Sequence, residues 1–228
     1  MELLKHGLLV VAALCWSASA QAMDWNVSLD MRAVMANSEQ SFLDGGLGKF
    51  RYNDGNSVHL GRARLELEQH LAESVRVVLD ASAWGDGDRH PVDITEAFME
   101  YRPYPNNSWR ARFRAGAFYA PSSVENRAPG WESPYTISSS AMNTWIAEEI
   151  RTIGVEAEMD HLGRVQGSPI DWSVFAGLYG WNDPAGTVIA DRGFAMHDRQ
   201  TTLFGQVGIS GDVPVPGHPL FYEIDRRA

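Results

Sequence analysis

Apolar and polar residues alternate with a period of two along most of the chain after residue 22. Side chains two positions apart lie on the same face of a strand, so this pattern predicts strands with one apolar and one polar face. The clearest strands are 25–35, 75–83, 109–117, 153–159 and 170–178. Weaker strands are expected near 58–71, 92–102 and 198–208, and a ninth begins near Leu220.

Within 58–71 the alternation changes phase around Gly61. One extra residue in a strand of an antiparallel pair produces such a shift, and an isolated glycine often marks the position. We therefore expect a β-bulge at Gly61.

The connections between these strands alternate between long and short. Outer-membrane β-barrels share this pattern, with short periplasmic turns and longer outer loops, and their tilted strands span the bilayer with about 9–11 residues. The sequence therefore predicts an all-β fold, an antiparallel transmembrane β-barrel of the outer-membrane porin type with about eight strands in this chain. In chain order the connections are 36–57, 72–74, 85–91, 103–108, 119–150, 160–169, 182–197 and 209–219.

Aromatic residues near strand ends fit the girdles that outer-membrane barrels place at the two membrane interfaces. Alternation alone is also compatible with a soluble β-sandwich, which buries one face of each sheet, so the connections and the aromatic positions favour the barrel only together. The aromatic residues in question are Trp25, Trp84, Tyr101, Trp109, Tyr119 and Trp181.

The first 22 residues have the pattern of a secretory signal peptide. A basic start at Lys5 precedes an apolar run over 7–16, which is too short to span a bilayer. Ala20-Gln21-Ala22 matches the small-residue cleavage site, so we expect cleavage after Ala22 and a barrel domain over 23–228. The expected location is the outer membrane of a Gram-negative cell. An uncleaved anchor is the alternative.

Composition excludes several classes of function. Cys15 is the only cysteine, so the chain after Ala22 has no disulfide, thiolate metal site or cysteine nucleophile. The net charge of -10 argues against nucleic acid as a partner. The acidic cluster at 86–96 with His90 matches no metal-binding loop, and no catalytic serine motif is present. We expect no enzyme, no cofactor and no metal.

Three arginines at a spacing of two must lie on one side of the strand 109–117. Facing lipid, each would cost about 2–4 kcal/mol near the midplane, so they are expected in the lumen. They either form an arginine ladder that acts on a permeating solute, or make structural ion pairs with Glu66, Glu96 and Glu100. The predicted pore-lining residues are Arg62, Arg64, Glu96, Glu100, Arg110, Arg112 and Arg114.

The third long connection, about 119–150, exceeds the length of a simple connector, and connections of this length are usually functional or disordered. We expect it to fold into the lumen and narrow the pore, or alternatively to pack over the rim. The predicted constriction residues are Ser122, Ser123, Glu125, Asn126, Arg127 and Glu132.

Three stretches of this region resemble the third-loop region of porins related to the phosphate-selective family: GAFYAPSSVEN at 116–126, WESPYT at 131–136 and NTWIAEEIR at 143–151. The resemblance implies a 16-stranded homotrimeric barrel that passes small solutes down their gradient, with the third loop as the constriction. Arg110, Arg112 and Arg114 match the arginine ladder of that family. Phosphate-selective members enrich the constriction in lysine and this loop has none, so a general or differently selective pore is expected.

The chain stops inside the ninth expected strand. A barrel strand in lipid cannot keep an unpaired edge, so we expect residues 1–228 to be the N-terminal part of a longer protein. An eight-stranded barrel with a tail is the alternative.

The sequence thus predicts a passive channel for small hydrophilic solutes, anions being one option. Its expected partners are outer-membrane lipid, lipopolysaccharide and two further copies of itself. The alternative is a secreted soluble β-sandwich that acts as a carbohydrate- or surface-binding module.

Overall fold

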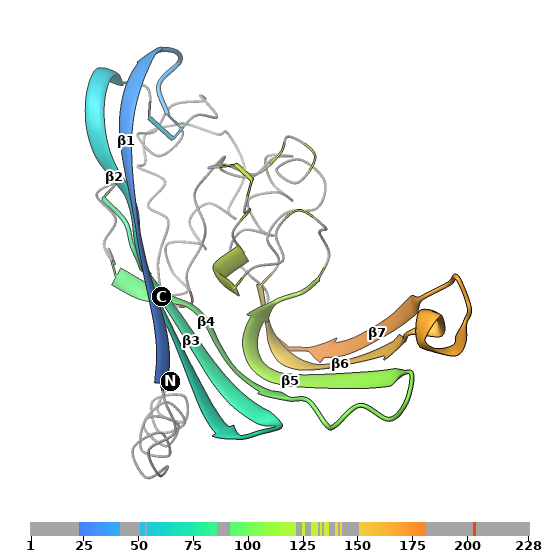
Figure 1. Ribbon diagram of the computed structural model, residues 1–228. Helices are drawn as coiled ribbons and strands as arrows, with labels where there is room; N and C mark the ends of the chain where they lie inside the picture. The colour runs from blue at the N-terminus through green and yellow to red at the C-terminus, as the bar shows by residue number, and fades with distance from the viewer. Residues whose placement is uncertain are drawn as a thin grey trace.

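The structure is a computed structural model that describes residues 23–41, 51–52, 54–85, 92–121, 125, 129–131, 133, 135–136, 140, 142, 151–180 and 203. Its main feature is a seven-stranded antiparallel sheet in which every strand pairs with its neighbours in the sequence (Figure 1). The strands are β1 (Met23–Asn37), β2 (Asp54–Ala72), β3 (Val75–Ala83), β4 (Val92–Tyr101), β5 (Trp109–Tyr119), β6 (Arg151–His161) and β7 (Trp172–Tyr179). Two short 3-10 helices are η2 (Pro129–Trp131) and η3 (Gly163–Gln166).

These seven strands confirm the all-β prediction and the first seven predicted strands, with β7 starting two residues later than Ile170. Over the described residues the sheet is open, with β1 and β7 at its edges. The predicted strands near 198–208 and Leu220 lie outside the described residues, except that the Leu203 N–H donates to the Ile94 carbonyl oxygen at 2.9 Å.

Among the described residues, no helix has the length and apolar character needed to cross a membrane.

The bulge expected at Gly61 is confirmed by the pairing of β1 with β2. Asp30 lies opposite Arg62 and Met31 opposite Leu60, which leaves Gly61 without a partner in the register. The extra residue keeps Leu60 and Leu65 on the same face although an odd number of positions separates them. The bulge therefore keeps the apolar residues of β2 together along its whole length.

The two faces of the sheet differ in chemistry and in exposure. One face, called the apolar face below, carries large exposed apolar side chains on every strand except β3, among them Val27 and Leu29 on β1, Val155 on β6 and Leu178 on β7. The opposite, charged face buries acidic and basic side chains, among them Arg64, Asp80, Glu100 and Glu156. A soluble protein has the opposite distribution, because charged groups are rarely buried and large apolar patches are rarely exposed.

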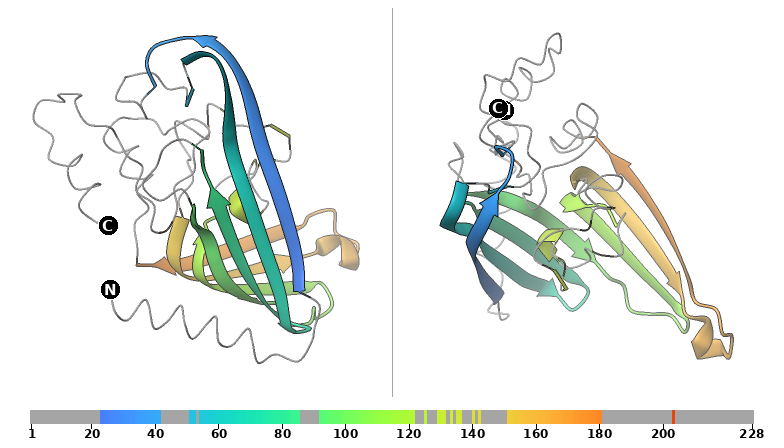
Figure 2. Two further views of the ribbon diagram at one scale, coloured as in Figure 1. Left: turned by 90° about the vertical axis from the view of Figure 1, so that its left-hand side faces the viewer. Right: turned by 90° about the horizontal axis from the view of Figure 1, so that it is seen from above.

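The sheet curves strongly, and the charged face is on its concave side. In both views of Figure 2 the sheet bends between β1–β4 and β5–β7, and η2 lies within the bend. Backbone and side-chain contacts of η2 with Glu96 and Tyr119 place it against the charged face. Part of the segment that follows β5 thus returns onto the sheet.

Four exposed aromatic side chains lie on the apolar face near the ends that the short connections join: Trp25, Tyr101, Trp109 and Trp172. Two of the predicted girdle residues are not there. Trp84 is 4% exposed with Arg51 and Arg62 over its ring, and Tyr119 is 3% exposed and stacked on Trp131. Both face protein groups because loop residues cover them. Trp181 lies outside the described residues.

Candidate functional site: the charged face

The three arginines of β5 lie opposite three acidic residues of β6. The register pairs Arg110 with Asp160, Arg112 with Glu158 and Arg114 with Glu156. Arg114 donates to Glu156 from Nη2 at 2.8 Å and from Nε at 3.1 Å, while Arg112 forms an ion pair with Glu158. Arg110 is exposed at the end of the row. The arginines share one face, as predicted, and that face is charged.

Of the predicted partners, only Glu100 pairs with one of these arginines in the described contacts, and the main partners lie on β6. Glu100 is 4.0 Å from Arg112, while Glu156 and Glu158 make the shorter contacts. Glu66 pairs with Arg64 at 3.0 Å. The difference arises because β5 is paired on its other side with β6, whose acidic residues lie directly across from the arginines.

Glu100 joins the β5–β6 row to strand β3. Its carboxylate is almost fully buried and lies 2.7 Å from Arg76 Nε and 2.5 Å from Arg102 Nε. Arg76 reaches Glu68 on β2 at 2.7 Å. A chain of alternating charges therefore crosses the sheet from β2 to β6, as buried charges require when they are to remain ionised.

A second group of charges lies nearer the ends joined by the long connections. Arg64 Nε is 2.5 Å from Asp80, which also accepts a hydrogen bond from the Thr95 hydroxyl. Arg62 lies with its guanidinium 5.5 Å from the centre of the Trp84 ring. Both predicted residues, Arg62 and Arg64, are therefore buried on the charged face.

An apolar cluster separates these two charged groups. Val78, Phe98 and Phe118 are buried together on the charged face, and the two rings meet edge to face at 6.2 Å. The guanidinium of Arg114 lies 4.5 Å from the centre of the Phe118 ring, a cation–π geometry. This cluster positions Arg114 while Glu156 binds its charge.

Glu96, another predicted residue, binds backbone groups. Its carboxylate accepts a hydrogen bond from the Tyr119 N–H at 3.0 Å and one from the Gly130 N–H at 2.6 Å. It thus connects β4 to the end of β5 and to η2. Glu96 was predicted to lie in the lumen, but its hydrogen bonds to the loop backbone were not predicted.

The chain matches no family model, no curated protein and no solved structure.

Of the predicted loop residues, only Glu125 is described, and it accepts a hydrogen bond from the Ser140 N–H at 2.7 Å. The other five lie outside the described residues: Ser122, Ser123, Asn126, Arg127 and Glu132. The same is true of Asp86, Asp88 and His90 in the acidic cluster.

Sequence reasoning missed several residues of the charged face. The alternation of Glu156, Glu158 and Asp160 with apolar residues is a readable signal, because it repeats the spacing of the arginines. Arg151 is fully buried and donates to the Thr95 carbonyl oxygen at 3.2 Å, and nothing in its local sequence predicts this. Its position depends on how the long connection returns to the sheet.

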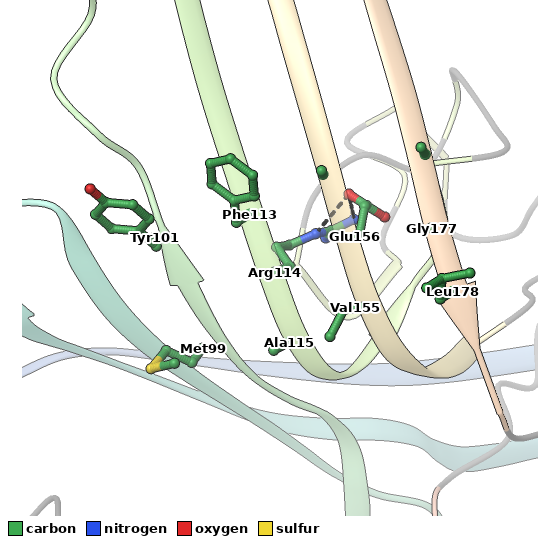
Figure 3. A pocket seen from close by; sticks show the side chains of 11 residues that line it. Met99, Tyr101, Phe113, Arg114, Ala115, Val155, Glu156, Gly177 and Leu178 are labelled. Atoms are coloured by element: carbon green, nitrogen blue, oxygen red, sulfur yellow. Dashed lines mark hydrogen bonds and ion pairs between the residues drawn. The ribbon is translucent and has the colours of Figure 1, made fainter.

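The apolar face contains a shallow hollow of about 500 Å³ over β4–β7 (Figure 3). Bulky side chains such as Tyr101, Phe113 and Leu178 surround small ones such as Ala157 and Ala176. Figure 3 also shows the bonds between Arg114 and Glu156, which belong to the charged face. The hollow lacks the convergent polar groups that fix a hydrophilic ligand, so the charged face is the better candidate site.

Proposed function

We propose that this chain forms the wall and the constriction of a passive outer-membrane channel for small hydrophilic solutes. The single observation that carries the proposal is the inverted distribution of the two faces, with buried charges on the concave side and exposed apolar residues on the convex side. Lipid-facing strands of membrane barrels are apolar, and their lumen is polar. The proposal assigns lipid to the apolar face and water to the charged face.

A soluble β-sandwich is the less favourable assignment. Such a fold packs the apolar faces of two sheets about 10 Å apart and leaves polar faces in water. Across the described strands there is one sheet, and its exposed face is the apolar one. The aromatic residues Trp25, Tyr101, Trp109 and Trp172 also follow one edge of this face, as an interfacial girdle does.

We expect the channel to discriminate only weakly between anions and cations. Arg112 and Arg114 each have a carboxylate partner on β6, so this part of the wall presents both signs of charge to a solute. A wall of paired charges orders water and polar groups without a strong net field. Small neutral and ionic solutes are both expected to pass.

The proposal includes outer-membrane lipid and lipopolysaccharide as surroundings of the apolar face. The proposal also includes a homotrimer of 16-stranded barrels, which the porin resemblance implies. Export by a signal peptide at 1–22 completes the proposed localisation.

The decisive test is bilayer conductance of the refolded chain. The protein is refolded in detergent, run boiled and unboiled on a gel, and added to a planar lipid bilayer. A faster or oligomeric unboiled band with discrete conductance steps is the expected result, and the reversal potential in a salt gradient reports the ion selectivity. An unshifted band together with a silent bilayer would contradict a channel formed by this chain.

A further inference from the structure

Within the connection from β5 to β6, residues 120–150, the described helix η2 is bound to strand β4 of the sheet. Glu96 is 4% exposed and accepts hydrogen bonds from the Tyr119 N–H and the Gly130 N–H. Tyr119 ends β5, and Gly130 lies in η2, inside the connection. One buried carboxylate therefore holds both the start and a middle segment of the loop.

The neighbouring residue Thr95 holds the other end. Its carbonyl oxygen accepts a hydrogen bond from Arg151 Nη1 at 3.2 Å, and Arg151 is the first residue of β6. Both Thr95 and Glu96 are buried on the charged face, although consecutive residues of a regular strand lie on opposite faces. A register shift explains this, because Asp80 pairs with Glu96 while Ala81 pairs with Ile94, which makes Thr95 the extra residue of a bulge.

The segment that Glu96 binds also packs closely against the charged face. Gly130 has φ of 69°, which favours glycine, and a Cβ added there would lie 2.6 Å from Arg64 Nε, so η2 packs closely against that guanidinium. Trp131 is 4% exposed, and its ring stacks on Tyr119 at 5.3 Å. Trp131 itself has φ of 55°, a conformation that a bulky residue keeps only when its surroundings stabilise it.

We infer that Glu96 is the positioning residue that anchors η2, within the connection from β5 to β6, against the charged face, so that this part of the connection is a fixed constriction and not a mobile lid. The functional consequence, a constriction in a pore, rests on the proposed channel, whereas the anchoring of η2 by Glu96 does not depend on it. Loss of both hydrogen bonds to the charged acceptor is expected to shift the equilibrium between docked and released loop by about a hundredfold.

The experiment compares Glu96→Ala and Glu96→Gln with the parent chain, all carrying Cys15→Ser and Ser133→Cys. A spin label on position 133, two residues after Trp131, reports loop mobility in the refolded chain, and single-channel recordings report conductance. Glu96→Ala should narrow the spectral lines of the label and raise both the conductance and its fluctuations. Glu96→Gln should give an intermediate effect, because its amide keeps one acceptor oxygen and places a donor near the second N–H.

Asp171→Ala is the matched control. Asp171 also accepts a backbone hydrogen bond, from the Arg164 N–H at 3.2 Å, and pairs with that arginine, but it lies in the short connection at the other end of the sheet. Its removal should leave both the label and the conductance unchanged. If Glu96→Ala fails to fold, Glu96→Gln takes its place, because it keeps a polar side chain of the same size in the buried position, and it should still broaden the motion of the label relative to the parent chain.

The outcomes distinguish failure of the Glu96 anchor from failure of the proposed channel. A label that stays immobilised in Glu96→Ala, or in Glu96→Gln where Glu96→Ala fails to fold, overturns the inference. A released label with unchanged conductance leaves Glu96 as a purely structural anchor and overturns its role in the constriction. A released label in a chain that never conducts supports the anchor and contradicts the proposed channel.

Discussion

At the scale of single residues, the charged face depends on reciprocal pairing of buried groups. The Glu156 side chain is almost completely buried and contacts both Arg112, at 3.5 Å, and Arg114, at 2.8 Å. Removal of one partner from such a pair leaves a buried charge without compensation, and this loss outweighs the modest net value of the intact pair. Arg110, which is exposed at the end of the same row, lacks this constraint.

Replacement of Arg114 by alanine should therefore lower the free energy of unfolding by about 3–5 kcal/mol. Replacement of Arg110 should change it by less than about 0.5 kcal/mol, since substitutions at exposed surface positions rarely do more. Urea unfolding of the two variants in lipid vesicles, followed by tryptophan fluorescence, measures both values. Equal decreases in the free energy of unfolding would mean that Arg114 does not stabilise the buried Glu156 carboxylate.

At the scale of elements, bulges decide which side chains each face receives. The bulge at Gly61 was predictable, because the apolar alternation on either side of it differs in phase. The bulge at Thr95 has a weaker signal, the adjacent polar residues Thr95 and Glu96 in an otherwise alternating strand. Its consequence, two consecutive buried residues that bind the loop, is visible only in the paired sheet.

Deletion of Gly61 should reverse the faces of residues 54–60 and place Val58 and Leu60 on the charged side. Such a chain is expected to lose its heat-modifiable folded band on a gel. Gly61→Ala is the matched variant, because it keeps the residue count and its Cβ meets only the flexible ends of Asp30 and Arg32. A deletion variant that folds as well as Gly61→Ala would show that the register of β1 with β2 tolerates a slip.

At the scale of the whole molecule, the exposed apolar face is the feature that distinguishes the proposed membrane protein from the soluble alternative. Val155 lies near the middle of β6 on this face and is 51% exposed, and Val165 in η3 is 63% exposed. Water would tolerate a charge at both positions. Lipid would penalise a charge only at the first, by about 2–4 kcal/mol near the bilayer midplane.

Val155→Arg should accordingly reduce the fraction of chain that folds into lipid vesicles, while Val165→Arg should fold like the parent. The heat-modifiable fraction on a gel gives this quantity for all three chains. Equal folding of both variants would favour the soluble alternative.

The sequence by itself determined the strands, their two faces and the bulge at Gly61. These features follow from local periodicity, since neighbouring side chains of a strand alternate whatever the strand is paired with. The shared face of Arg110, Arg112 and Arg114 was predictable for the same reason.

Only the tertiary structure decided which charges meet. Glu156 is 42 positions from Arg114 in the sequence, and Arg151 is 56 from Thr95, so their contacts depend on strand register and on the course of the long connection. The role of Glu96 depends on both, because the strand register sets it opposite Asp80 on the charged face and the loop supplies the N–H of Gly130 that it binds. Periodicity is a property of one strand, whereas these contacts join strands and loops whose relative positions are set by packing and hydrogen bonding across the sheet.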